Sequence, residues 1–182
     1  MNLKKAVIEC RSKAQSNRIV EYVGNDKDRF AALVRLFLDG PYRTTQRASW
    51  PLTCCIQNDP KLVKPWLREI LSQLKKDEVH PAIKRNTIRS LQFVELPGKY
   101  WGPVTDLCLK YLIDKKEPVA IRVFSMTVLY NLSKNVPEIK RELRLVIEDQ
   151  LPFGSPAFTS RAKKVLSALD LEQDPVAVSL KR

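Results

Sequence analysis

The sequence predicts an all-α protein: a right-handed α-α superhelix (a solenoid) of about four helix pairs that follow an N-terminal helix. Apolar residues recur at helical spacing along most of the 182 residues, and no alternating strand pattern stands out. Four arginines, Arg47, Arg85, Arg122 and Arg161, recur at spacings of 38, 37 and 39 residues, and each opens an apolar helical stretch. A repeat of this period is typical of stacked helix pairs.

The individual elements follow from apolar spacing and from the positions of proline. An N-terminal helix is expected over residues 3–23, ended by the turn sequence at residues 24–26. Four helix pairs follow, at residues 27–38 with 42–57, 60–75 with 81–94, 100–113 with 118–134, and 137–149 with 156–169. Pro81, Pro118 and Pro156 fall in first helical turns, where proline is tolerated. We expect a single repeat domain over residues 1–170 and a loosely ordered C-terminal tail over residues 171–182.

An aspartate precedes three of the four arginines at a constant distance. Asp39, Asp77 and Asp114 each stand eight residues before their arginine, whereas Phe153 occupies that place before Arg161. In this respect residues 39–169 resemble HEAT or armadillo-type repeats, which place an aspartate in the turn and an arginine near the start of the second helix. The resemblance implies a structural Asp–Arg ladder, in which each guanidinium makes a forked contact with the turn aspartate. Exposed arginines are the alternative interpretation.

A second resemblance is confined to three short segments, QRASWPL, EPVAIRVFSMTVLYNL and SRAKKVL. They resemble a group of short bacterial proteins sometimes labelled adenylosuccinate lyase. That lyase is a much longer chain with a flexible serine loop and catalytic His and Ser residues. His80 is the only histidine here, and GSPAFTS lacks the pattern of that loop. Lyase activity is therefore not expected.

Basic residues are concentrated on the second helix of each pair, the helix that lines the concave face of HEAT-like arrays. The only acid counted with these helices is Glu117, at the N-terminal edge of one of them. Against it stand ten cations: Arg43, Arg47, Lys84, Arg85, Arg89, Arg122, Lys134, Arg161, Lys163 and Lys164. We expect a basic concave face, with Arg85 and Arg89 projecting together because they are four residues apart. Trp50, one turn after Arg47, either stacks on a nucleic-acid base or packs in the core.

Other chemistries have little support in the sequence. There is no phosphate-binding glycine loop, no cluster of metal ligands and no apolar run long enough to span a membrane, so no cofactor, metal or membrane is expected. The four cysteines lack CxxC spacing and are expected to be reduced and buried. Since no secretory signal stands out, a cytoplasmic location is expected.

These observations favour a non-enzymatic binding module that presents its basic face to an extended anionic partner, either an acidic protein segment or a nucleic acid. The net charge of +12 agrees with such a partner. No small-molecule substrate is expected. The alternative function is that of a HEAT-like DNA-repair protein or alkylpurine DNA glycosylase, although no aspartate falls in the proposed second helices. A solenoid that docks to a protein complex by its edges is a further possibility.

Overall fold

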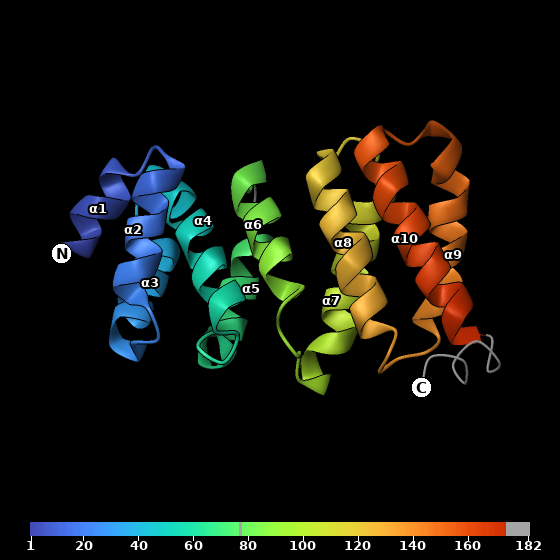
Figure 1. The fold of residues 1–182 in the computed structure, drawn as a ribbon, viewed down its shortest axis with the longest axis horizontal. Helices are drawn as coiled ribbons and strands as arrows, with labels where there is room; N and C mark the ends of the chain where they lie inside the picture. The colour runs from blue at the N-terminus through green and yellow to red at the C-terminus, as the bar shows by residue number, and fades with distance from the viewer. Residues whose placement is uncertain (77, 174–182) are drawn as a thin grey trace. The chain divides into compact units, whose positions relative to one another are not determined.

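The structure is a computed structural model, and it describes residues 1–76 and 78–173. Within these residues it contains no strand, so the all-α prediction is confirmed (Figure 1). The described helices are α1 (Leu3–Glu9), α2 (Lys13–Val23), α3 (Lys27–Asp39), α4 (Tyr42–Asn58), α5 (Leu67–Ser72), α6 (Pro81–Leu91), α7 (Trp101–Ile113), α8 (Val119–Leu132), α9 (Ile139–Gln150) and α10 (Pro156–Gln173). Short 3₁₀ turns join some of them.

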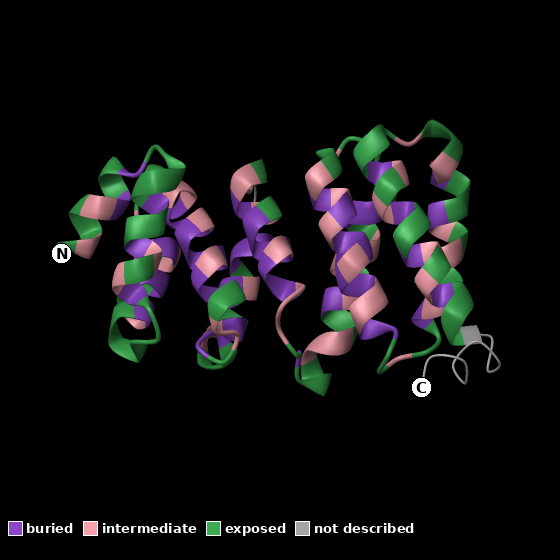
Figure 2. Cartoon of the chain, in the orientation of Figure 1, coloured by how far each residue is buried: buried purple, intermediate pink, exposed green. Residues whose placement is uncertain are grey.

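The chain divides into two compact units, Met1–Glu95 and Leu96–Arg182, which are described separately. In the first unit α4 is the central helix, packing against α2, α3 and α6. In the second unit α8 has this place, packing against α7, α9 and α10. Buried positions lie on the facing sides of these helices (Figure 2). The largest fully buried side chains include Phe30, Phe37 and Ile88 in the first unit, and Leu112, Ile121 and Phe158 in the second.

The N-terminal segment forms two helices rather than the single helix expected over residues 3–23. The backbone leaves the helical region at Cys10, and Ser12 caps the second helix. The Ser12 hydroxyl accepts from the backbone N–H of Gln15, while the Gln15 side chain accepts from the N–H of Ser12. This capping box starts a new helix because it satisfies N–H groups that would otherwise lack partners. The exposed residue Arg11 therefore lies in the junction.

The helix expected over residues 60–75 is also shorter than predicted. Only Leu67–Ser72 is α-helical, and 3₁₀ turns over Lys64–Trp66 and Gln73–Lys75 flank it. Pro65 is the physical reason on the N-terminal side, since proline lacks the N–H that an α-helix interior requires. Apolar residues of this segment still pack in the core, with Leu67 and Ile70 both buried.

Glycine is required where α3 turns into α4. A Cβ atom at Gly40 would lie 2.4 Å from the carbonyl oxygen of Leu36 and 2.9 Å from a methyl of Thr44. The same turn recurs before α10, where a Cβ at Gly154 would lie 2.8 Å from Phe158. In both turns a threonine five residues on, Thr45 or Thr159, donates its hydroxyl to the glycine carbonyl. The two units thus share a turn that the sequence periodicity did not reveal.

Helix α10 extends into the segment that was expected to be a loosely ordered tail from residue 171. Glu172 forms an ion pair with Lys140 at 2.8 Å and accepts a hydrogen bond from the Tyr130 hydroxyl at 2.8 Å. Asp170 is paired with Arg144. These contacts tie the last described turn of α10 to α8 and α9. The rest of the predicted tail, residues 174–182, lies outside the described residues.

Candidate functional site

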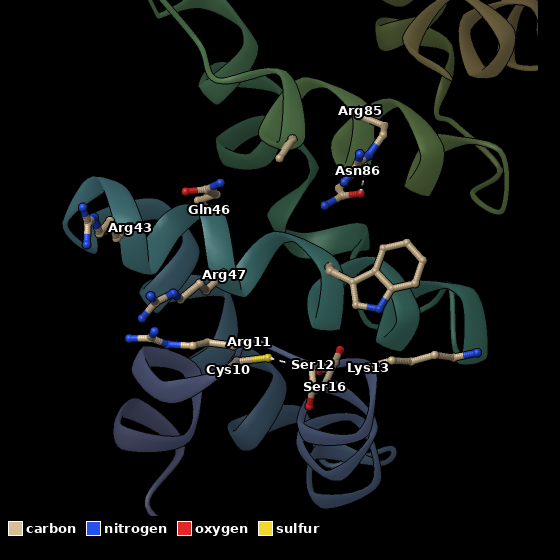
Figure 3. A pocket seen from close by; sticks show the side chains of 12 residues that line it. Cys10, Arg11, Ser12, Lys13, Ser16, Arg43, Gln46, Arg47, Arg85 and Asn86 are labelled. Carbon is tan, nitrogen blue, oxygen red and sulfur yellow. Dashed lines mark hydrogen bonds between the residues drawn. The ribbon is translucent and has the colours of Figure 1, made fainter. Parts of the chain in front are cut away.

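The first unit contains an open pocket of about 710 Å³ where three parts of the chain meet (Figure 3). The α1–α2 junction and first turn of α2 form one wall, α4 a second and α6 a third. Among the described residues that line it, five side chains are cationic and none is a carboxylate. These lining residues are Cys10, Arg11, Ser12, Lys13, Ser16, Arg43, Gln46, Arg47, Trp50, Ala82, Arg85 and Asn86. We call this the basic pocket. Its residues lie up to 76 positions apart in the sequence, so folding is what brings these charges to one pocket.

The wall formed by α4 carries Arg43 and Arg47, one helical turn apart. Arg47 is half-buried and donates a hydrogen bond from Nη1 to the carbonyl oxygen of Ile8. This bond attaches α4 to the last turn of α1 and fixes the guanidinium beside the junction. Figure 3 shows the side chains of Arg47 and Arg11 extending to the same side. Arg43 is exposed.

The wall formed by α6 is positioned by a buried polar seam between α4 and α6. Asn86 donates from Nδ2 to the Ser49 hydroxyl at 2.7 Å, and the Thr53 hydroxyl donates to the Asn86 carbonyl at 2.8 Å. All three residues are almost fully buried. The Oδ1 atom of Asn86 also accepts from Nε of Arg85 at 3.4 Å. The seam therefore sets both the register of the two helices and the direction of the exposed Arg85 guanidinium.

Trp50 lines the pocket, and Arg89 covers one face of its ring. The Arg89 guanidinium lies 4.5 Å from the centroid of a Trp50 ring, and Nη2 donates to Gln57 at 3.2 Å. Arg89 is not among the residues that line the basic pocket. Arg85 and Arg89 were predicted to project together. Arg85 lines the pocket, whereas Arg89 makes a cation–π contact with the indole of Trp50.

The helix junction also contributes thiol and hydroxyl groups to the pocket. Burial raises the pKa of the Cys10 thiol, and the positive charge of Arg47 partly opposes this effect. The Ser16 side chain is 1% exposed, and its hydroxyl has no hydrogen-bond partner among the described residues. A buried hydroxyl without a partner is costly, which makes Ser16 an unusual lining residue.

Among the remaining predicted cations, the arginines of the second unit are tied into its own packing. Arg122 donates from Nε to the Leu112 carbonyl at 3.2 Å and from Nη2 to Gln150, and its guanidinium lies 4.6 Å from the Phe158 ring. Burial lowers the pKa of Arg122, and the nearby Asp114 charge opposes that shift. Arg161 donates to the Thr127 hydroxyl at 3.0 Å.

The predicted lysines lie outside the basic pocket. Lys134, Lys163 and Lys164 are exposed in the second unit, and Lys84 is half-buried on α6 in the first unit.

The forked Asp–Arg contacts are not formed at the two positions where both partners are described. No ion pair between described residues joins Asp39 to Arg47 or Asp114 to Arg122. Asp114 instead accepts from the backbone N–H of Lys116 at 2.9 Å and caps its own turn. The arginines find carbonyl, amide and hydroxyl oxygens in place of carboxylates. Asp77 lies outside the described residues.

Sequence reasoning missed Arg11, Lys13, Gln46, Ser16 and Asn86. The first two were placed inside a continuous helix and were not counted with the second helices. The S-x-x-Q signal at Ser12 could have revealed the helix break and therefore the junction. Gln46, Ser16 and Asn86 are identified only from the packing of the helices. The sequence does not indicate which neighbouring element a polar residue on a helix faces.

Other potential sites are weakly supported in the described residues. His80 caps α6, its Nδ1 accepting from the N–H of Ala82 at 3.0 Å. No group of His, Cys, Asp and Glu there is arranged to hold a metal. The described helices include none with the length and apolar character needed to cross a membrane.

The helices, the recurring turn and the central position of α4 and α8 define a helical-repeat protein. The sequence matches the HEAT repeat domain family over residues 3–169. The chain therefore belongs to the HEAT repeat family, which consists generally of non-enzymatic scaffolds for protein interactions. No curated protein and no solved structure matches the chain.

Proposed function

We propose that this protein is a nucleic-acid-binding HEAT module and that the basic pocket of the first unit is its principal contact site. One observation carries the proposal. Five cations from three separate parts of the chain line a single pocket, and no described residue that lines it is a carboxylate. Cations grouped in this way favour a polyanion, because binding releases the counterions condensed on its phosphates.

Trp50 favours nucleic acid over an acidic protein segment as the partner. It lines the same pocket as the cations, and Arg89 holds its ring. A fixed aromatic wall beside cations suits an unpaired base attached to a bound phosphate, since every base has a π-face. An acidic peptide would use the charges but not the ring. The general role of the family in protein interactions makes the acidic segment the competing partner.

Excision of an alkylated base is less well supported than binding. The chemistry of a glycosylase calls for an acidic residue near the scissile bond, and none of the lining residues that the structure describes is acidic. Arg122 and Arg161 are occupied by contacts within the second unit. A DNA-repair role would then rest on binding alone.

Fluorescence anisotropy with labelled single-stranded DNA and RNA tests this function. If three or four phosphates are neutralised, affinity should fall by about 20- to 50-fold between about 50 and about 200 mM salt. Unlabelled polyglutamate should compete poorly. Strong competition by polyglutamate, without nucleic-acid binding, would assign the pocket to an acidic protein segment.

A charge-matched pair of variants separates the pocket from bulk charge. Arg43→Glu/Arg85→Glu changes two pocket cations, whereas Arg18→Glu/Arg68→Glu changes two exposed arginines of the same unit that do not line it. Both double variants change the net charge equally. We expect the first to abolish measurable binding and the second to weaken it only a few-fold through long-range electrostatics. Equal losses would contradict a localised site.

A further inference from the structure

We propose that the basic pocket recognises a terminal phosphate, the monoester group at the end of a nucleic-acid strand or on a mononucleotide. This inference rests on the proposed function and deepens it by naming the group that enters the pocket. Its basis is that cationic side chains from three walls line one open pocket of about 710 Å³, in which no described lining residue is a carboxylate.

The charge of the pocket suits a monoester better than a backbone diester. A diester carries one negative charge, while a phosphate monoester carries about 1.5 to 2 near pH 7 and offers three terminal oxygens. Arg11 and Lys13 come from the α1–α2 junction and the start of α2, Arg43 and Arg47 from α4, and Arg85 from α6. The side chains of Arg11 and Arg47 extend to the same side, while Lys13 extends to the other (Figure 3). Two guanidinium groups on one side can contact several oxygens of one phosphate, whereas a continuous backbone has to enter and leave the site.

Most of the hydrogen-bond donors in the pocket remain available. The side chains of Arg11, Lys13 and Arg43 make no hydrogen bond or ion pair with another described residue. Arg47 uses Nη1 on Ile8, and Arg85 uses Nε on Asn86. The other guanidinium N–H groups of these two arginines can form charge-assisted bonds to phosphate oxygens.

The first turn of α2 provides an additional observation that points to a ligand. Ser12 and Lys13 bring the start of this 11-residue helix to the pocket, where its partial positive charge favours an anion. Ser16, one turn further along, lines the pocket with a buried hydroxyl that has no described partner. A bound phosphate or a water that it orders would supply the missing hydrogen bond.

The size of the pocket leaves room for more than phosphate. Pockets of about 300–1,000 Å³ hold small molecules of nucleotide size. Trp50 lines this volume together with the side-chain amide of Gln46. The nucleoside next to the phosphate therefore has an aromatic wall within the same pocket.

Four labelled or calorimetric titrations at fixed salt test the terminal-phosphate site. The ligands are three versions of one single-stranded oligonucleotide, and adenosine monophosphate. One version has a 5′-phosphate, one has a 3′-phosphate and one has hydroxyl ends, and each version is labelled on an internal base. At least one phosphorylated strand should bind about tenfold tighter than the hydroxyl-ended strand. A tenfold gain in affinity is what about one additional charge-assisted hydrogen bond contributes. Equal affinity of all three strands would overturn the inference and leave the nucleic-acid function standing.

The mononucleotide separates the two sources of the phosphate and the two proposals. Binding of adenosine monophosphate without binding of any strand would support the terminal-phosphate site and overturn the nucleic-acid function. Preference for a phosphorylated strand over the mononucleotide would support both. Failure of all four ligands would overturn both.

Single variants then locate the preference. Arg43→Gln should reduce the preference for the phosphorylated strand by about tenfold, because Arg43 is exposed and makes no described side-chain contact. Arg68→Gln, an exposed arginine on α5 outside the pocket, should leave it unchanged. A full preference retained in a folded Arg43→Gln/Arg85→Gln double variant would contradict the assignment.

Discussion

At the scale of single residues, arginines at equivalent positions of the repeat have different environments and different contacts. Arg85 is exposed at the edge of the basic pocket, while Arg122 is half-buried and bonded to two oxygens over an aromatic ring. The regular spacing of the arginines was visible in the sequence. The groups that accept their hydrogen bonds were not. They are carbonyl and amide oxygens brought by other helices, which no spacing rule specifies.

This difference predicts different costs of truncation. Arg122→Ala should lower the free energy of unfolding by about 1–3 kcal/mol, because Gln150 and the Leu112 carbonyl lose their donor. Arg85→Ala should change it by less than about 0.5 kcal/mol, as is usual for exposed positions. Urea unfolding of both variants measures these changes in the free energy of unfolding. A large loss for Arg85→Ala would restore the ladder interpretation at that repeat.

The thiols provide a second prediction at the residue scale. Burial raises the pKa of both Cys55 and Cys108 to about 12, so at pH 8 nearly all of each remains the unreactive thiol. Cys54 is half-buried, and burial raises its pKa as well. In the native protein Cys54 should react with iodoacetamide first, and Cys108 should react only after unfolding. Mass spectrometry of the labelled peptides gives the order, and early labelling of Cys108 would contradict the packing of α7 against α8.

At the scale of elements, the sequence predicted the main helices but not their interruptions and turns. The stretches that became α3, α4, α7, α8 and α9 were placed within one or two residues at each end. The break at residues 10–12 and the short α5 were missed, because local capping by Ser12 and the proline at residue 65 compete with apolar periodicity.

The α3–α4 turn gives a test of close packing. Gly40→Ala should destabilise the protein by about 1–3 kcal/mol, because the new methyl group would meet the Leu36 carbonyl. Gly102→Ala is the matched control, since a Cβ there has no neighbour within 4 Å. That change should be neutral or stabilising by up to about 1 kcal/mol, as alanine favours helix. Thermal unfolding compares the two, and a tolerated Gly40→Ala would contradict the turn.

The seam between α4 and α6 links the packing of elements to the pocket. Asn86→Ala should cost about 1–3 kcal/mol, since the Ser49 hydroxyl loses a buried donor. It should also weaken oligonucleotide binding, because Asn86 orients Arg85. Asn17→Ala, at an exposed position of α2, is the control and should change neither property. Unchanged stability of Asn86→Ala would show that the seam does not set the register.

At the scale of the whole molecule, total charge and charge placement carry different information. The net charge of +12 and the excess of cations on second helices pointed to an anionic partner. They did not indicate which cations line one pocket. The α1–α2 junction and the start of α2 add Arg11 and Lys13 to the pocket that Arg43 and Arg47 line. The predicted cations of the second unit are used in its own packing or lie exposed on α10 and just after α8. Such grouping depends on tertiary contacts between distant segments.

The most direct test of the central claim is hydrogen–deuterium exchange of the full chain with and without a saturating single-stranded oligonucleotide. Binding at the basic pocket predicts slower exchange in peptides covering residues 10–16, 43–50 and 82–86, with little change in α9. Protection confined to peptides of the second unit, or strong binding without protection of those three segments, would contradict the account.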